Sequence, residues 1–519
     1  MTAAPHAVVI GAGFGGLAAA VRLRAMGYRV TLLEALPDPG GRARVFRQDG
    51  FTFDAGPTVI TAPHLLDELF QFHGRDSRDY FELMPVDPFY RIAFPGGETF
   101  DFTGDDDRLL AQIEAFEPRD VEGYRRLARY AERIFQVGFL ELGDQPFHRP
   151  WDMARIIPQM IRLGSHRSVY DAVARFIRDE RLRQVFSFEP LLVGGNPFRT
   201  SSIYLLIHTL EKRWGVHYAR GGTGSIVQGL VRLLVEIGVE LSFGTPVEEI
   251  EVQGGRVRAV HTSGAGRIPC DLVVSNADPS VVYSRLVHPR HRERNSDRAV
   301  ARKSSSMGLF VGYFGARGTW PDLAHHTILL GPRYRGLLDD IFEGKVLADD
   351  FSLYLHAPTR SDPAMAPEGH EAFYVLSPVP NNRSGINWEE EGERYFARIL
   401  EALERRLLPG LGDRVTTRFH LTPDYFQDDL RSRDGSAFGP EPLLTQSAYF
   451  RYHNRSSDVE GLFHVGAGTH PGAGVPGVLS SARVLDRVVP RPRPRRARPS
   501  EVDRKRSPGA DAVLPRSPR

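Results

Sequence analysis

The segment AVVIGAGFGGLAAAVRLRAMGYRVTLLE occupies residues 7–34 and has the pattern of a strand, a glycine-rich turn, a helix and a second strand. Residues 7–10 form a short apolar run, as expected for a buried parallel strand. Residues 17–26 have the composition of a helix, and Gly27 is placed to end it. Residues 28–33 form a second apolar run that ends at Glu34. This order predicts a βαβ unit.

The turn of this unit, GAGFGG, predicts a dinucleotide-binding site. Gly11 permits the tight turn, Gly13 lets the backbone approach a pyrophosphate, and Gly16 lets the helix pack on the strand. The helix N-terminus then faces the phosphates. Glu34 follows Gly11 by 23 residues, where a carboxylate binds ribose hydroxyls and disfavours NADP. The expected cofactor contacts here are Gly11, Ala12, Gly13, Phe14, Gly15, Gly16 and Glu34.

The rest of the chain favours a flavin over a nicotinamide cofactor. Gly472, Gly474 and Gly477 repeat the glycine spacing, but no strand ending in an acid follows them. One dinucleotide site suits a tightly held flavin and leaves no obvious site for NAD(P)H. Gly41 and Arg42, followed by Gly56, Pro57 and Thr58, are similar to the extension found in flavoproteins of the glutathione-reductase-like class. The pattern therefore favours an oxidase or a desaturase over a reductase.

A second glycine-rich segment, GAGTHPGAGVPG at residues 466–477, precedes a predicted final helix. Its small residues allow the backbone close to a flat ligand, and the helix N-terminus favours negative charge on a reduced flavin. We expect Gly466, Gly474 and Val475 to contact the cofactor. His470 could serve as a base, or it could pack and bond to the backbone.

Composition indicates a globular protein of two or three domains. The chain has 519 residues, of which 41% are hydrophobic and 25% charged, which argues against wholesale disorder. A single cysteine excludes a disulfide framework within the chain and indicates a reducing compartment. No run of 18 apolar residues exists, so no membrane-spanning helix is expected. Residues 490–519 contain seven prolines and ten basic residues, which predicts a disordered tail.

Hydrophobic patterns predict the other elements. Helices are expected within residues 105–140, 151–190, 224–237, 389–407 and 478–489. Strands are expected at residues 239–243, 246–252, 256–262, 271–275, 308–314 and 351–356.

Seven motifs together resemble the bacterial-type phytoene desaturases of carotenoid biosynthesis, over residues 5–488. They are VIGAGFGGL (9–17), GFTFDAGPTVIT (50–61), LLVGGNPF (191–198), RGGTG (220–224), SNAD (275–278), FSLYLHAP (351–358) and GAGTHPGAGVPG (466–477). One departure is His464, where the family usually has an aliphatic residue.

The resemblance implies an α/β fold: a Rossmann-like FAD-binding domain of the amine-oxidase type with an inserted α+β substrate domain. The FAD domain would comprise residues 1–85, 215–305 and 436–489, and the substrate domain residues 86–214 and 306–435. Val247 and Asn276 complete the expected FAD contacts. The implied reaction is desaturation of phytoene, a C40 polyene, towards neurosporene or lycopene, with oxygen or a quinone as electron acceptor. The implied location is cytoplasmic, at the surface of the cell membrane, with no nucleic-acid partner.

Residues 151–161, WDMARIIPQMI, hold the candidate catalytic pair. Asp152 and Arg155 lie three residues apart, on one face of a predicted helix. Asp152 could accept the substrate proton while Arg155 sets its charge. Two alternatives stay open: an entrance helix that dips into the membrane with Trp151 at the interface, and a surface ion pair.

The sequence offers candidates for a substrate site and none for a metal site. A hydrocarbon needs an apolar tunnel, for which residues 191–193 and 310–314 are candidates, although either could be plain core. His288, His291, His325 and His326 have no acid or cysteine at ligand spacing in what look like charged loops, so we expect no metal site. Alternative functions are another carotenoid-acting flavoenzyme, an amine oxidase, an NAD-dependent dehydrogenase and a non-redox prenyl-binding protein.

Overall fold

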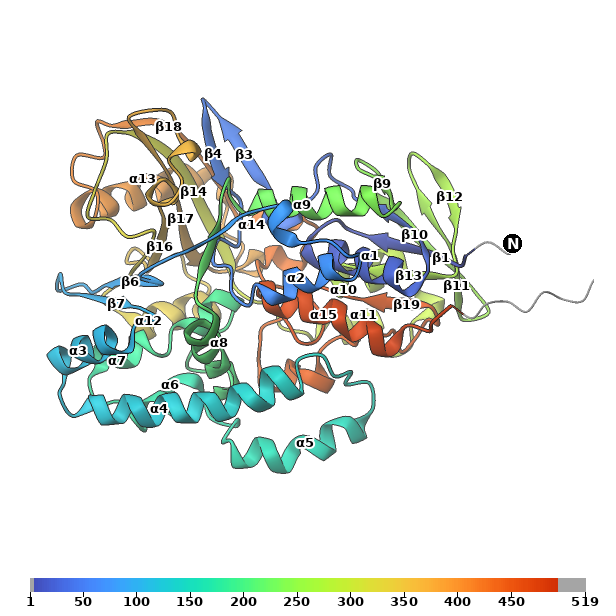
Figure 1. Ribbon diagram of the computed structural model, residues 1–519, viewed down its shortest axis with the longest axis horizontal. Coiled ribbons are helices and arrows are strands. Elements are labelled where there is room, and N and C mark those ends of the chain that lie inside the picture. Colours follow the sequence, from blue (N-terminus) through green and yellow to red (C-terminus); the bar gives the residue numbers. More distant parts are fainter. Residues whose placement is uncertain (1–3, 493–519) are drawn as a thin grey trace, which may run out of the picture.

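The structure is a computed structural model that describes residues 4–492. Most of the predicted tail, residues 490–519, therefore lies outside the described residues. Two β-sheets dominate the described part, and a layer of helices lies along one side of the molecule (Figure 1).

A five-stranded parallel sheet carries the predicted βαβ unit. Its order is β19 (Leu462–His464), β13 (Leu272–Ser275), β1 (His6–Ile10), β2 (Arg29–Leu33) and β9 (Glu240–Ser242). β1 pairs in parallel with β2 on one side and β13 on the other. The sheet thus joins segments that are more than 450 residues apart in the chain.

Helices cover one face of this sheet and an antiparallel sheet covers the other. The helices are α1 (Phe14–Met26), α2 (His64–Gln71), α9 (Thr223–Glu236) and α15 (Val475–Val488). The antiparallel sheet is β10 (Val247–Gln253), β11 (Arg256–Thr262) and β12 (Gly266–Pro269). The side chains of β1 alternate between the two faces of the sheet, so β1 contributes to the core on each face. Ala7 and Val9 pack with the helices, while Val8 and Ile10 pack with β10 and β11.

A seven-stranded mixed sheet forms the second body. Its order is β18 (Val415–Leu421), β14 (Gly308–Arg317), β17 (His370–Val379), β16 (Leu353–His356), β15 (His326–Leu329), β6 (Tyr90–Ala93) and β7 (Thr99–Phe102). α13 (Trp388–Arg406) packs against one face. Phe310 and Phe314 point to that helix, whereas Leu309 and Val311 point to the opposite face.

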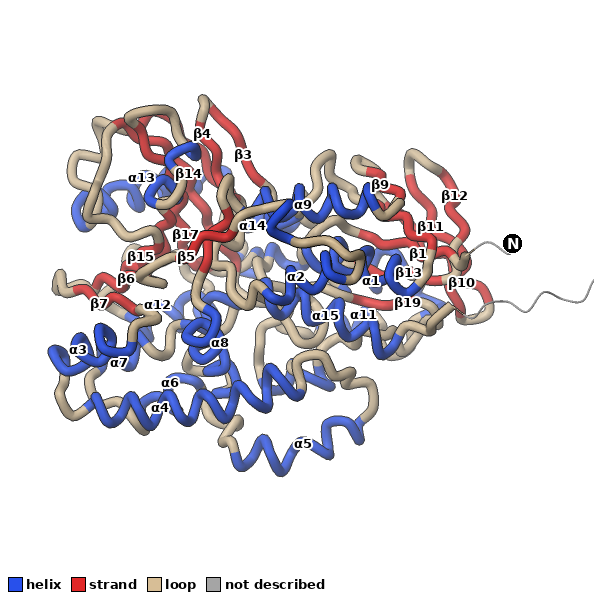
Figure 2. The backbone as a smooth tube through the Cα atoms, viewed as in Figure 1, coloured by secondary structure: helices blue, strands red, loops and turns tan. Residues whose placement is uncertain are grey.

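The remaining helices lie below the sheets in the view of Figure 2 or connect strands. They are α3 (Asp106–Phe116), α4 (Asp120–Phe135), α5 (Pro150–Arg162), α6 (Val169–Ala174), α7 (Glu180–Val185), α8 (Leu206–Trp214), α10 (Pro279–Val281), α11 (Asp297–Ala301), α12 (Tyr334–Asp339) and α14 (Pro423–Asp428). Two short antiparallel ribbons, β3 (Val45–Gln48) with β4 (Phe51–Asp54) and β5 (Leu83–Pro85) with β8 (His217–Ala219), lie where the two bodies meet.

The elements expected from sequence are present, with boundary shifts of a few residues, and the strands β3 to β8, β12, β15, β17 and β18 were not anticipated. These strands are short or lack simple alternation, so tertiary pairing rather than local pattern defines them. The domain boundaries given above stay a prediction. Among residues 4–492, no helix combines the length and the apolar character needed to cross a bilayer.

Candidate functional site

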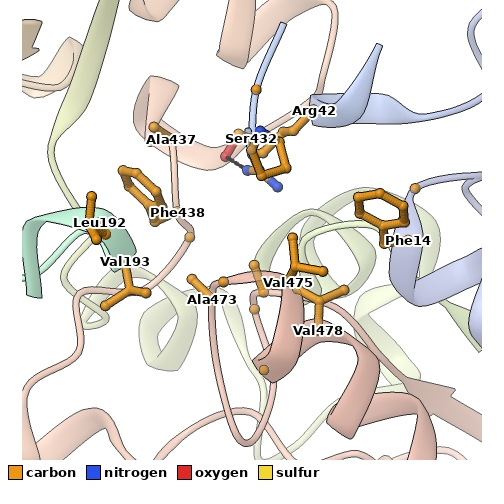
Figure 3. A pocket seen from close by; sticks show the side chains of 18 of the residues that line it. Phe14, Arg42, Leu192, Val193, Ser432, Ala437, Phe438, Ala473, Val475 and Val478 are labelled. Atoms are coloured by element: carbon orange, nitrogen blue, oxygen red, sulfur yellow. Dashed lines mark hydrogen bonds between the residues drawn. The ribbon is translucent and has the colours of Figure 1, made fainter. Parts of the chain in front are cut away.

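A cavity of about 850 Å³ opens between the two bodies. The ends of β1, β2 and β10 and the start of α15 line one part of it, and residues of β14, β15, β16 and β17 line another. Figure 3 shows Phe14, Arg42, Val475 and Val478 facing Val193 and Phe438 across this space.

The glycine turn has the geometry that the sequence predicted. Gly11 has a φ of +94°, a conformation that favours glycine, and its amide donates to the carbonyl of Leu33. A Cβ on Gly16 would lie 1.9 Å from the carbonyl oxygen of Gly11, so only glycine lets α1 start so close to β1. The turn therefore brings the N-terminus of α1 to the cavity wall.

Glu34 connects the second strand to this turn. Its carboxylate accepts a 2.6 Å hydrogen bond from the amide of Ala12 and a 2.9 Å bond from the amide of Leu36. The residue is buried at the cavity wall, where each oxygen keeps capacity for a further hydrogen bond. It can therefore hold ribose hydroxyls while it fixes the turn.

Arg42 supplies a positive charge that forms no salt bridge with residues 4–492, although the Asp278 carboxylate is close enough to favour the charged form. The side chain lines the cavity, and its Nη2 donates a 3.2 Å hydrogen bond to the hydroxyl of Ser432 (Figure 3). Its buried Nε has no hydrogen-bond partner among the described residues, and burial lowers the pKa of the guanidinium. A buried cation with free donors fits a pyrophosphate or another anionic part of a dinucleotide.

The loop at Gly56–Thr58 is anchored to the second sheet. Thr58 Oγ1 lies 2.9 Å from the hydroxyls of both Tyr354 and Tyr374. The Tyr374 hydroxyl also lies 3.2 Å from the carbonyl oxygen of Gly56, to which it can donate. These bonds fix the loop at the boundary between the two parts of the cavity.

Comparisons with known proteins agree with this geometry. The family model for flavin-containing amine oxidoreductases matches residues 14–484. The chain is 52% identical to a lycopene-forming phytoene desaturase of Pseudescherichia vulneris, over 92% of this chain and 97% of that one. It is 44% identical to a neurosporene-forming phytoene desaturase of Rhodobacter capsulatus, over 93% and 94%. An oxidoreductase from Methanosarcina mazei shares the fold, with a TM-score of 0.65 at 17% identity over 93% of this chain and 100% of that one.

The chain belongs to the flavin-containing amine oxidoreductase family. Its cofactor is FAD, as the sequence predicted, and its fold is the amine-oxidase-like α/β fold.

The cavity brings together most of the residues that the sequence predicted to contact FAD. Those that line it are Gly11, Gly13, Phe14, Glu34, Gly41, Arg42, Gly56, Pro57, Thr58, Val247, Asn276, Gly474 and Val475. The others stand behind the wall. Ala12 bonds to Glu34, and Gly15, Gly16 and Gly466 allow tight packing around Asn276 and Gly11. Which of these touch the bound flavin stays a prediction.

Asn276 ties the two glycine segments of the flavoenzyme together. A Cβ on Gly15 would lie 2.4 Å from its Oδ1, and a Cβ on Gly466 would lie 2.6 Å from the same atom. Gly466 also donates its amide to the hydroxyl of Ser481 on α15. The N-terminal turn and the C-terminal segment therefore meet at one side chain on the strand end between them.

His470 bonds to the backbone and also lines the cavity. Its Nε2 lies 3.2 Å from the carbonyl oxygen of Leu142, and its ring packs edge-on against Phe147. Burial lowers its pKa to about 4, which keeps the ring neutral near neutral pH. The sequence left two roles open for His470, a base or a packing residue that bonds to the backbone. These contacts are those of the packing residue.

The part of the cavity away from the glycine turn is apolar. Leu191, Leu192 and Val193 line it, but of residues 310–314 only Val311 does. Phe310 and Phe314 belong instead to the core beneath α13, because successive strand residues face opposite sides. The sequence did not single out further lining residues on β14 to β17, namely Leu309, Ile328, Leu353, Tyr354, Tyr374 and Leu376.

A buried carboxyl group was also missed. Glu211 on α8 lines the cavity and accepts a 2.6 Å hydrogen bond from the Tyr90 hydroxyl. Burial, and then the nearby Glu189, raise the pKa of Glu211 well above its usual range. A buried carboxyl group in an apolar wall is a polar feature that a local sequence pattern does not reveal.

Asp152 and Arg155 do not line the cavity. The Asp152 carboxylate accepts hydrogen bonds from the amides of His148 and Arg149 at 3.1 and 2.9 Å, so it caps the start of α5. Arg155 is exposed on the same helix. The side of α5 that faces the cavity carries Met153, Ile156 and Met160 instead. A catalytic role for the pair stays a prediction.

Proposed function

We propose that this flavoenzyme desaturates phytoene towards neurosporene or lycopene. The observation that carries the proposal is the identity of 52% and 44% to two phytoene desaturases over more than nine-tenths of each chain. The apolar cavity beside the flavin residues supports it independently of the sequence match.

The walls suit a substrate without polar groups. The aliphatic and aromatic side chains of Leu192, Val193, Val311 and Phe438 offer contact area and no obligatory hydrogen bond. A long hydrocarbon would be selected by the shape and length of such a cavity and not by polar recognition. The same walls exclude water from the reacting carbons.

Each desaturation converts a CH2–CH2 unit into CH=CH and releases one hydride and one proton. The bound FAD supplies the hydride acceptor. The protein must hold the substrate against the cofactor and receive the proton. Asp152 and Arg155 remain the proposed pair for the proton, and α5 would have to bring them closer to the cavity. The two electrons of each cycle would pass to oxygen or to a quinone.

The surface of α5 supports attachment to a membrane. Trp151 and Ile161 are 74% and 65% exposed, and Ile157 is also exposed. α5 packs beside residues Ala448–Phe450, where Phe450 is exposed as well and Ala448 lines the cavity. Figure 1 shows α5 at the outer edge of the helical layer. Apolar side chains around a cavity opening would let a membrane-dissolved polyene enter directly.

The test is expression in a bacterium that accumulates phytoene, followed by chromatography of the extracted pigments with absorbance spectra. Red lycopene or yellow neurosporene would establish the activity and give the number of steps. The Arg42→Ala variant, which should bind FAD poorly, serves as the control for background conversion. Unchanged phytoene in cells that contain folded, FAD-loaded protein would overturn the proposal and favour a later carotenoid or a C30 polyene as substrate.

A further inference from the structure

Three buried histidines converge behind the Gly56–Thr58 loop. They are His325, His326 and His356, and one ring nitrogen or more from each lies within 4.8 Å of the others. All three side chains are at most 5% exposed. The sequence interpretation of His325 and His326 as residues of a charged loop was wrong, since His326 opens the buried strand β15.

Strand pairing assembles the cluster. β15 and β16 are antiparallel, and His326 and His356 are direct partners in their register. His325 immediately precedes β15, and the amide of Ala357 donates to its carbonyl. His356 is 30 residues further along the chain than His326, so its proximity follows from the sheet and not from local spacing.

Two of the three imidazoles are within hydrogen-bond distance of an oxygen, and the third, His356, has a more distant one. His325 Nδ1 lies 2.7 Å from Ser361 Oγ, and His326 Nδ1 lies 2.7 Å from the Tyr354 hydroxyl. His356 Nε2 lies 3.7 Å from the carboxylate of Asp54. His325 and His326 are oriented as metal-binding histidines are, with one ring nitrogen held by an oxygen and the other left for the metal.

The inward ring nitrogens are unsatisfied. Nε2 of His325, Nε2 of His326 and Nδ1 of His356 are buried and have no hydrogen-bond partner among residues 4–492, and His356 Nε2 has none either. Buried polar atoms without a partner are uncommon, and each costs about 1–3 kcal/mol. Burial also lowers the pKa of all three histidines, so the rings are neutral and have lone pairs to offer.

We propose that His325, His326 and His356 bind one zinc ion through these three nitrogens. Three imidazoles suit zinc and similar transition metals, whereas magnesium and calcium prefer oxygen ligands. Zinc–nitrogen bonds of about 2.0–2.1 Å place two tetrahedral ligand atoms roughly 3.4 Å apart. Side-chain shifts of about 1 Å would bring the three nitrogens to that spacing, and a water molecule would complete the tetrahedron.

The proposed zinc would stabilise the wall of the flavin site without touching the flavin. Tyr354 accepts from His326 in the tautomer that binds metal, and its hydroxyl can donate to Thr58. Asp54 accepts from the amide of Thr223 and the hydroxyl of Tyr218, so it joins the cluster to α9 and β8. The zinc would fix the position of the Gly56–Thr58 loop, and this role does not depend on which substrate the enzyme uses.

The test begins with the zinc content of the full-length flavoenzyme, expressed with zinc and purified after removal of any affinity tag. The expected result is about one zinc per chain, reduced at least tenfold in His326→Ala. The control is the double variant His288→Ala and His291→Ala, which removes two neighbouring histidines outside the cluster and should retain the zinc. Zinc retained in folded His326→Ala would overturn the proposal.

Three measurements on the unaltered protein keep the test decisive if His326→Ala does not fold. X-ray absorption at the zinc edge should show three nitrogen ligands at imidazole distance. Removal of the metal by a chelator and addition of cobalt should give the visible bands of a tetrahedral site, and addition of zinc should raise the Tm. A metal-free protein that neither binds cobalt nor gains stability from zinc would exclude the site.

Discussion

The backbone amide of Ala12 donates a 2.6 Å hydrogen bond to the carboxylate of Glu34. The acid that ends β2 therefore also fixes the glycine turn that follows β1. Because both lie at the cavity wall, we expect this one residue to link the conformation of the turn to the binding of the FAD ribose.

Replacing Glu34 should weaken FAD binding more than it weakens the fold. In Glu34→Gln, an NH2 group would take the place of one oxygen, and a charge-assisted hydrogen bond worth about 1.5–3 kcal/mol would be lost. We expect FAD affinity to fall roughly tenfold or more, measured by titration of the apoprotein. Glu401→Gln, an exposed change on α13, should keep the affinity of the parent protein. Unchanged affinity in Glu34→Gln would rule out the ribose contact.

Arg42 should act on FAD through its charge. Arg42→Met keeps much of the side-chain volume and removes the buried cation, so FAD affinity should fall by about 10- to 100-fold. The matched control is Arg47→Met, on the exposed side of β3. Equilibrium titration followed by flavin fluorescence gives both values. Equal affinities for the two variants would contradict a contact between Arg42 and the dinucleotide.

Asp152→Asn separates the two roles of this residue. An asparagine can still accept hydrogen bonds from the His148 and Arg149 amides, but it cannot accept the substrate proton. We expect Asp152→Asn to keep the Tm of the parent protein and Asp152→Ala to lose about 1 kcal/mol of stability, because the helix cap is removed. Turnover of Asp152→Asn tests the chemistry: a loss of activity at unchanged Tm would establish the catalytic role, and full activity would exclude it.

His464 should make the protein sensitive to acid. Its imidazole is buried beside Tyr283, and burial lowers its pKa to about 3. In the unfolded chain the imidazole of His464 has a pKa of about 6.5. At acidic pH the unfolded chain therefore binds a proton that the folded chain does not bind. The contribution to stability is complete above pH 6.5 and is lost as the pH falls towards 3, by about 2 kcal/mol at pH 5.

The measurement is chemical unfolding at pH 7 and pH 5. His464→Leu should lose less stability between these two pH values than the parent protein does. Tyr283→Phe is the control, because it removes the hydroxyl next to His464 and leaves the imidazole, so it should lower stability similarly at both pH values. A pH response of His464→Leu equal to that of the parent protein would contradict the assignment.

The exposed face of α5 predicts membrane binding. Trp151→Glu combined with Ile161→Glu should weaken binding to liposomes by roughly 100-fold or more, since each apolar side chain contributes about 1.5–3 kcal/mol when buried. The control is Val235→Glu, at an exposed apolar position of α9. Flotation with vesicles measures the bound fraction. Equal flotation of all three proteins would show that α5 is not the docking surface.

Local sequence was enough to predict the geometry of the glycine turn. Gly11, Gly16 and Glu34 belong to one βαβ unit. Its turn and the end of its second strand are adjacent because they are close in the sequence and the two strands pair directly. The resemblance of longer motifs added FAD and the amine-oxidase-like fold. The sequence did not show which face of the sheet each strand residue lies on. Val311 could therefore not be assigned to the cavity, nor Phe310 to the core, before their sheet was known.

The sequence by itself therefore determined the strand–turn–helix with its dinucleotide-binding pattern, the resemblance to a flavin family and the lack of an 18-residue apolar run. Only the tertiary structure decided that Arg42 lines the cavity with its Nε unpartnered among residues 4–492, that Asp152 caps α5, and that His356 joins His325 and His326 beside Asp54. The physical reason is the range of the interactions. A turn or a helix depends on bonds between near neighbours, whereas a cavity or a histidine cluster depends on the register of strands from distant parts of the chain.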